Sequence, residues 1–407
     1  MKFHWTLALV FLTSVFFFSE AYAQSIPIPK MNIFYQGPIN VSGELSEEEL
    51  QEIAFYHKGV VTMAGPINAQ HMKDLNPNLM MLRYFNLKGV HTYDSNWNQF
   101  NSLNLQRRDD KGNPLIHSIY NWYLADVRKS NCADLLVQTI QNLPELSVYD
   151  GLMMDDTSLS WPYDFTAPEE DMDNYIASFD QSYSGLHYTL NQIVSSFPDK
   201  IVVFNGYNTW TSGQDLTQYD GTHFIDNADG MSFEGFSGPG NRFFSNDRII
   251  THLQQFQHLA STYDRIYSIN EIGNTLDYNH RIFSLSLFLL GFQPNISQSY
   301  YNYIGLEEGY FQPYPEYHLD LGNPLEMMQE SSGIYSRRLE NVTVYVNLSL
   351  GDFALNFMGK EKLILEGGGN RSNFGSVSWQ AVESVILPPT SAIIVRNSVN
   401  VSILNIF

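Results

Sequence analysis

The sequence YDGLMMDDTS, residues 149–158, decides the fold. Gly151 to Met154 form a short apolar run that ends in two adjacent carboxylates, Asp155 and Asp156, and then in small polar residues. A buried parallel strand ends in this way when its last side chains face a pocket. Two neighbouring acids repel each other unless water, a partner or chemistry compensates. The stretch therefore predicts a catalytic strand end in a parallel α/β barrel.

Apolar runs of strand length recur along the first three quarters of the chain, with helical patterns between them. We expect strands at residues 31–36, 59–65, 79–85, 151–154, 201–204, 230–233, 265–269 and 296–303. Ser46 and Glu49 have the spacing of a capping box, which marks the start of the first helix. Eight strands alternating with helices over roughly 270 residues have the size of a (β/α)8 TIM barrel. A doubly wound open sheet is the alternative, disfavoured because no Gly-rich phosphate loop follows the first strand.

Two segments depart from this alternation. Residues 87–114 are polar and show no clear period, so we expect a long excursion on the face where the strands end. Residues 116–126 are ambiguous, with a strand-like composition. From Ser332 onward the runs are short and alternating, without helix-period segments. The predicted domains are thus a signal peptide (1–23), an α/β catalytic barrel (24–331) and a small all-β, antiparallel C-terminal domain (332–407).

The first residues resemble a secretory signal. Lys2 supplies the basic start, residues 5–18 the apolar run, and Ala21-Tyr22-Ala23 a small-x-small cleavage site. A membrane anchor is the alternative, but the run is shorter than the ~20 apolar residues that a spanning helix needs. A secreted or periplasmic enzyme is expected. The single cysteine, Cys132, leaves its stability to a large core rather than to disulfides.

The composition limits the classes of molecule that the protein is expected to bind. The net charge of −21 argues against nucleic acid and anionic membranes. The 25 Tyr, 27 Phe and 6 Trp are typical of proteins that handle sugars, although core packing explains most of them. A carbohydrate is the expected partner, and no obligate protein partner is evident. Histidines with metal-ligand spacing and a G-x-S-x-G elbow are both missing from the sequence, so we expect no metal, no cofactor and no esterase chemistry.

The carboxyl ends of barrel strands carry the active site. Asp155 and Glu234 end the fourth and sixth expected strands, where they could face each other as the two carboxylates of a glycoside hydrolase. Substrate-binding candidates at or near the strand ends are Asn86, Asp126, Trp161, Asn205, Tyr207, Trp210 and Glu271. Asp126 either supports the site or caps the helix of residues 133–143.

The pleat of the strand separates the two adjacent aspartates. Alternation directs Asp155 and Met153 to one side and Asp156 and Met154 to the other. If Asp155 faces the mouth, Asp156 is left to cap the next loop or to bind a sugar hydroxyl. The sequence favours Asp155 as the nucleophile and keeps Asp156 as the alternative. Arg83 is expected to neutralise a carboxylate inside the barrel.

These motifs resemble known glycosidase families. YDGLMMDD is similar to the strand-four signature of the α-amylase and α-galactosidase groups, in which the final Asp is the nucleophile, here Asp155. The doubled DD, MMLRYFN, NWYLAD and GMSFEGF resemble the polygalactosaminidases and the hypothetical glycosyl hydrolase barrels of bacteria. The strand-six acid of α-galactosidases is the proton donor, which implies that role for Glu234. The tail, IYSRRLENVTVYVNLS with ILPPTSAIIV, resembles the C-terminal β-domain of amylase-like barrels. Met153 stands where amylases have Arg and α-galactosidases Lys, which leaves the substrate class open.

Two functions remain from the sequence. One is a secreted hydrolase of α-glycosidic bonds in a poly- or oligosaccharide, and the other is a sugar-binding barrel without catalysis. They separate on whether Asp155 and Glu234 converge. A retaining hydrolase needs the carboxyls roughly 5–6 Å apart, an inverting one about 6.5–9.5 Å. Glu234 is expected to be the less solvated of the two, because Phe233 and Phe236 flank it, and hence to be the acid.

Overall fold

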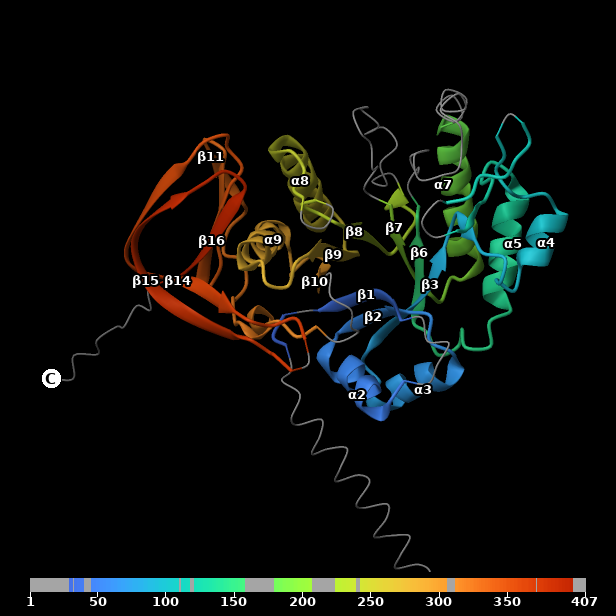
Figure 1. Cartoon of the computed structure of the whole chain (residues 1–407), viewed down its shortest axis with the longest axis horizontal. Helices are drawn as coiled ribbons and strands as arrows, with labels where there is room; N and C mark the ends of the chain where they lie inside the picture. Colours follow the sequence, from blue (N-terminus) through green and yellow to red (C-terminus); the bar gives the residue numbers. More distant parts are fainter. Residues whose placement is uncertain are drawn as a thin grey trace, which may run out of the picture.

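The computed structural model describes residues 29–31, 33–39, 45–109, 111–117, 121–157, 179–206, 224–238, 242–305, 312–370 and 372–397. A parallel eight-stranded sheet forms its centre (Figure 1). The strands follow one another round the sheet as β1 (Phe34–Ile39), β2 (Gly59–Thr62), β3 (Met80–Asn86), β6 (Gly151–Asp155), β7 (Ile201–Asn205), β8 (Gly230–Glu234), β9 (Ile266–Gly273) and β10 (Gln298–Gly305). A parallel bridge between Ile33 and Tyr301 joins the first strand to the last. The predicted (β/α)8 barrel is confirmed.

Helices connect the strands and cover the outside of the barrel (Figure 1). They are α2 (Glu47–Tyr56), α3 (Pro66–Leu75), α5 (Ser130–Gln141), α7 (Phe179–Ser196), α8 (Asn246–Thr262) and α9 (Tyr278–Gly291). The predicted capping box is present at α2, where Ser46 Oγ accepts from Glu49 N and Glu49 Oε2 accepts from Ser46 N. Within the described ranges, the helices are all too short or too polar to cross a membrane.

The excursion between β3 and α5 is more ordered than its sequence indicated. It contains the short helix α4 (Trp97–Ser102) and a two-stranded antiparallel sheet of β4 (Gly89–Val90) and β5 (Tyr123–Leu124). Of the ambiguous residues 116–126, the structure describes 116, 117 and 121–126, and among these Tyr123 and Leu124 form β5. Within the excursion, Trp122 lies so close to Gly89 of β4 that a Cβ there would meet the indole at 2.8 Å.

The strands β6 and β8 begin with the same device. Asp150 and Asp229 precede them, and each accepts a backbone N–H of the neighbouring strand, from Met81 at 2.7 Å and from Val202 at 2.9 Å. A glycine follows each aspartate. A Cβ at Gly151 would lie 2.1 Å from the carbonyl oxygen of the next strand's first residue, and one at Gly230 would lie 2.3 Å from its counterpart. The repeated Asp-Gly pair thus sets the register at the amino-terminal end of both strands.

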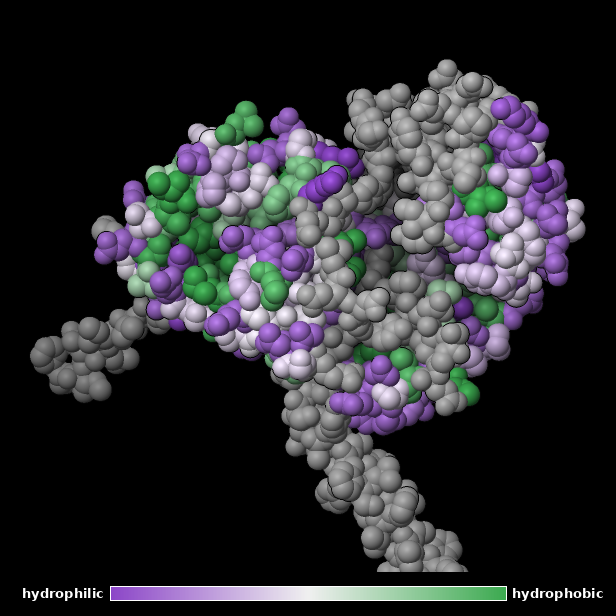
Figure 2. All heavy atoms as spheres, in the orientation of Figure 1, coloured by the Kyte–Doolittle hydropathy of each residue, from purple (hydrophilic) through white to green (hydrophobic). Residues whose placement is uncertain are grey.

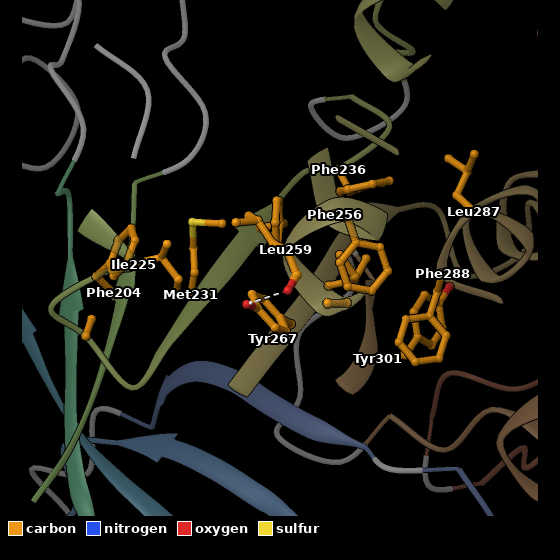
Figure 3. Packing of buried hydrophobic residues seen from close by; sticks show 14 of the residues in the cluster. Phe204, Ile225, Met231, Phe236, Phe256, Leu259, Tyr267, Leu287, Phe288 and Tyr301 are labelled. Carbon is orange, nitrogen blue, oxygen red and sulfur yellow. Dashed lines mark hydrogen bonds between the residues drawn. The ribbon is translucent and has the colours of Figure 1, made fainter. Parts of the chain in front are cut away.

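Aromatic side chains fill the layer between the sheet and α8 and α9 (Figure 3). Phe256 of α8 packs between Phe233 and Phe288, with ring centroids 5.7 and 6.2 Å away. Tyr267 of β9 enters the same layer and donates its hydroxyl to Leu259 O at 3.0 Å. This packing makes the outer face of β8 and β9 rigid.

The tail forms a six-stranded antiparallel sheet, as predicted. Its strands are ordered β11 (Gln329–Ser331), β12 (Ile334–Arg338), β13 (Val342–Asn347), β16 (Ser391–Arg396), β14 (Phe353–Glu366) and β15 (Ser376–Leu387). A 3-10 turn, η5 (Pro315–His318), precedes them. Hydrophobic residues gather over this sheet in Figure 2, and Leu350 and Ile386 are among the exposed ones.

The sheet and the barrel share α9, whose residues from His280 to Gly291 are all buried except Ile282. Arg337 of β12 donates to the carbonyls of Leu289, Leu290 and Phe292 at the end of α9. Burial lowers the pKa of Arg337 to about 10, so it stays charged at neutral pH and faces the negative end of the helix dipole. At the other end of α9, Arg281 forms a buried bidentate pair with Glu316.

Arg83 is not inside the barrel. Leu82 and Tyr84, its neighbours on β3, face the interior cluster, so the pleat sends Arg83 to the outer face. There its Nε lies 3.5 Å from Oε1 of the buried Glu145. The expectation that Arg83 neutralises an interior carboxylate was wrong, because it rested on the residue type and not on the parity of the strand.

Candidate active site

Three neighbouring strand ends bring two carboxylates and one amide together. Asn205, at the end of β7, donates Nδ2–H to Oδ1 of Asp155 on β6 at 2.9 Å and to Oε2 of Glu234 on β8 at 2.6 Å. Because the two oxygens share one nitrogen, they are separated by no more than the sum of these distances, about 5.5 Å.

Asp155 receives two further hydrogen bonds. Tyr84, which faces the interior from β3, donates its hydroxyl to Asp155 Oδ2 at 2.6 Å. The backbone N–H of Asp156 donates to Oδ1 at 2.8 Å. Hydrogen bonds to a carboxylate favour its ionised form, so this arrangement suits a group that must act as an anion. Sequence reasoning missed Tyr84. Its only signal was its position two residues before Asn86, on the same face of the strand.

Asp156 leaves the strand direction at once. Its φ of 56° lies in the left-handed region, which Asp tolerates better than most residues. The side chain then turns to Asn86, whose Nδ2 donates to Asp156 Oδ2 at 2.6 Å. Asn86 Oδ1 accepts in turn from the backbone N–H of Lys88 at 2.9 Å and of Gly89 at 2.5 Å. Asp156 is therefore beside the pair and tied to β3.

Burial dominates the electrostatics of the pair. Burial, together with the charges of Asp156 and Glu234, raises the pKa of Asp155 to about 7, against the hydrogen bonds from Tyr84 and Asp156 N, which lower it. Burial also raises the pKa of Glu234, partly offset by the hydrogen bond from Asn205. Since the two carboxyls interact, their protons leave in two steps that belong to the pair. Both side chains are half-buried, and the expectation that Glu234 is the less solvated of the two stays a prediction.

Burial also raises the pKa of Tyr84 far above its usual range. The hydroxyl therefore keeps its proton at any pH at which the protein is folded and can donate it to Asp155.

Asp126 and Glu271, two of the remaining candidates, lie outside this hydrogen-bond network. Asp126 follows β5 and is almost fully buried. Burial alone would raise the pKa of Asp126, but the hydrogen bonds and charge of Arg128, with Arg107 and Lys129, hold it below its usual range. This cluster fixes the start of α5. Glu271 is fully buried on β9 and points away from the pair. Trp161, Tyr207 and Trp210 lie outside the described residues.

In the ranges that the structure covers, the His, Cys, Asp and Glu side chains form no group of three that could hold an ion. Two ionisable carboxyls at short range, one stabilised as an anion, are instead suited to nucleophilic attack combined with proton transfer.

Comparison with known proteins places this geometry in a family. The sequence profile of hypothetical glycosyl hydrolase family 15 matches residues 73–343, which include the whole site. No curated protein matches the chain. Among solved structures, the glycoside hydrolase domain of PelA from Pseudomonas aeruginosa aligns with 66% of this chain and 95% of its own at 13% identity and a TM-score of 0.42. The maltogenic α-amylase AmyB from Thermotoga neapolitana aligns with 90% of this chain and 98% of its own, at 12% identity and a TM-score of 0.45. Amy13B of Eubacterium rectale aligns with 92% of this chain and 98% of its own, at 8% identity and a TM-score of 0.47.

Proposed function

We propose a function for this chain, which belongs to hypothetical glycosyl hydrolase family 15. It is an exported retaining hydrolase of α-glycosidic bonds. Asp155 is the nucleophile and Glu234 the acid and base. The observation that carries the proposal is the amide of Asn205, which donates to both carboxylates. It keeps Oδ1 of Asp155 within about 5.5 Å of Oε2 of Glu234, close to the roughly 5–5.5 Å of retaining enzymes and below the 6.5–9.5 Å of inverting ones.

The first step joins the sugar to the protein. Asp155 attacks the anomeric carbon, and the bond from that carbon to the leaving oxygen breaks. Glu234 gives its proton to the departing oxygen, so the leaving group departs as a neutral alcohol. The three hydrogen bonds to Asp155 keep its lone pairs aligned and its charge stabilised until attack.

The second step releases the sugar. Glu234, now ionised, takes a proton from water, and the resulting hydroxide attacks the anomeric carbon as the bond to Asp155 breaks. Glu234 is protonated again and Asp155 is an anion again, so the pair returns to its starting charge. Burial raises the pKa of Glu234, which favours its protonated form at the start of the cycle and its return to that form at the end.

Linkage and location rest on the sequence. The α-linkage follows from the similarity of YDGLMMDD to the strand-four signature of α-amylases and α-galactosidases. Export follows from the residues 1–23, which have the order of a secretory signal. An α-linked poly- or oligosaccharide outside the cytoplasm is the proposed substrate, with Asn86 and Asp156 beside the pair as donors and acceptors for its hydroxyls.

The test is turnover in matched variants. Purified protein is first screened against a panel of α-glucans and galactosamine-containing polysaccharides, and then against α- and β-linked aryl glycosides. Asp155→Asn should abolish turnover and spare sugar binding. Glu234→Gln should slow substrates with poor leaving groups by about 10²–10⁴-fold and activated aryl glycosides far less. Asp150→Asn, at the opposite end of β6, is the control and should keep its activity.

Three outcomes would contradict the proposal. NMR of the first-formed product should show the anomeric configuration of the substrate, and inversion would exclude Asp155 as a nucleophile. Wild-type turnover by both variants would exclude the pair. If the wild-type protein bound sugars but hydrolysed none of the panel substrates, the result would favour the non-catalytic barrel.

A further inference from the structure

Glu271 is a carboxylate that the proposed reaction does not use. It lies on β9 next to Asn270, whose Nδ2 donates to Ser232 Oγ at 2.8 Å and to Ser268 Oγ at 3.0 Å inside the barrel. The pleat therefore turns Glu271 the other way, into the layer of Tyr267 and Ile269 beneath α9. Its side chain is completely buried. A buried carboxylate is expensive unless it holds something in place.

The carboxylate holds the turn that follows Glu234. The backbone N–H of Ser237 donates to Glu271 Oε2 at 2.9 Å. Glu271 Oε1 lies 3.6 Å from Nε2 of His280 in the first turn of α9. Nδ1 of that imidazole lies 3.3 Å from the hydroxyl of Tyr303 on β10. The turn is thus bonded to Glu271 on β9, and Oε1 of the same carboxylate lies beside the first turn of α9.

The turn itself has little freedom left. Gly235, directly after Glu234, has a φ of 57° and donates its N–H to Asn270 O at 2.7 Å. Ser237 O accepts from Phe244 N at 2.8 Å. Two adjacent residues of β9, Asn270 and Glu271, therefore hold the first and third residues after Glu234. The backbone that carries the acid is fixed against β9 immediately beyond the reacting carboxyl.

Ser237, His280 and Glu271 do not form a nucleophilic triad, although the residue types suggest one. Ser237 Oγ and Glu271 Oε1 both face the same nitrogen of His280, Nε2, at 3.4 and 3.6 Å. A relay needs the nucleophile on one ring nitrogen and the acid on the other. All three side chains are also buried, so a substrate has no access to them. The cluster is an internal support.

We propose that Glu271 is a positioning residue for Glu234. By accepting the N–H of Ser237, it fixes the turn 235–238 and thereby holds the acid at the distance from Asp155 that proton transfer requires. The proposal rests on the proposed function, because it takes Glu234 to be the proton donor. A displacement of about 1 Å at a catalytic group lowers the rate by about 10²-fold, which sets the size of the effect.

The experiment compares leaving groups. In Glu271→Ala, kcat for glycosides with poor leaving groups should fall by about 10²-fold, while kcat for dinitrophenyl glycosides and KM for both stay close to wild type. The dependence of kcat on leaving-group pKa should become steeper. Glu271→Gln keeps an oxygen acceptor for Ser237 N and nearly the same volume, so it should recover most of the lost rate.

Glu316→Gln is the matched control. Glu316 is also a fully buried carboxylate beside the first turns of α9, where it pairs with Arg281. It should lower the thermal midpoint without changing the leaving-group dependence. If Glu271→Ala does not fold, the test uses Glu271→Gln. This variant should then show a smaller loss of kcat, and only for glycosides with poor leaving groups.

The outcomes separate the two proposals. If Glu234→Gln shows the leaving-group pattern and neither Glu271 variant does, the positioning role is overturned and the proposed function stands. Equal losses on all substrates, or losses matched by Glu316→Gln, also overturn it. If Glu234→Gln itself lacks the pattern, the assignment of the acid fails first.

Discussion

Asp155→Asn should stabilise the protein as it abolishes turnover. Burial raises the pKa of Asp155 from 3.8 to about 7, so the folded state resists ionisation more than the unfolded chain does. A group with a raised folded-state pKa contributes its full stability below the unfolded value and loses it as pH rises through the folded value. The loss therefore runs from about pH 4 to pH 7. Asparagine carries no charge at any of these pH values, so the variant does not lose this stability as the pH rises.

The size of the effect follows from the shift. About three pKa units at about 1.4 kcal/mol each give an upper bound of about 4 kcal/mol above pH 7. Asp155 is half-buried at the barrel mouth, so solvent screening reduces this to about 2 kcal/mol. The hydrogen bonds survive the change, because Oδ1 of the amide replaces one oxygen and the hydroxyl of Tyr84 can accept from its NH₂.

The assay is urea unfolding of wild type and variant at several pH values between 4 and 8.5. The gain in unfolding free energy should be near zero at pH 4, rise through pH 5–7 and level off above. Asp150→Asn provides the contrast on the same strand. Asp150 pairs with Lys73 Nζ at 2.7 Å, so its loss should destabilise the protein at neutral pH by about 1 kcal/mol. An Asp155→Asn variant less stable than wild type at pH 8, or a gain independent of pH, would refute the reasoning.

Three further changes probe the surroundings of the pair. Asp156→Asn removes a charge that raises the pKa of both catalytic carboxyls, so the alkaline limb of the kcat/KM profile should move to lower pH by about one unit; an unmoved limb would contradict this. Tyr84→Phe removes a hydrogen bond that lowers the pKa of Asp155, so the acid limb should move to higher pH by about one unit, with thermal stability measured alongside as the control. Arg337→Met leaves the end of α9 uncapped and should cost about 3 kcal/mol in urea unfolding with KM unchanged; a stable variant would remove the capping role.

The architecture was predictable because its signals are local. Each buried strand is a short apolar run, and the turn that follows it is polar, so the order of elements can be read residue by residue. The capping box at Ser46 and the alternating runs of the tail are equally local. The order within the excursion between β3 and α5 was not predictable, because α4 and the short sheet depend on contacts such as that of Trp122 with Gly89.

The site was predictable in its residue types and not in its geometry. The strand-end rule identifies Asp155, Asn205 and Glu234, but not that Asn205 bridges the other two, which depends on side-chain rotamers and on the stagger of the barrel. Glu271 was misplaced for a different reason. The expected strand ended at residue 269, which put Glu271 in the mouth, whereas β9 continues to Gly273. With Asn270 facing inward, Glu271 has to face outward.

The repeated Asp-Gly pairs explain why two strands can carry the chemistry. Asp150 and Asp229 lie at the amino-terminal end of the barrel, where they satisfy backbone N–H groups and fix β6 and β8 against their neighbours. Five residues later, in both strands, comes the carboxylate of the pair. At that end burial and mutual repulsion raise the pKa of Asp155, so the same residue type weakens the fold where it enables the reaction. The hydrogen bonds of Asp150 and Asp229 at the amino-terminal ends of the strands help to offset this loss of stability. It follows that substitutions at Asp150 or Asp229 should change stability first and rate second, and substitutions at Asp155 or Glu234 the reverse.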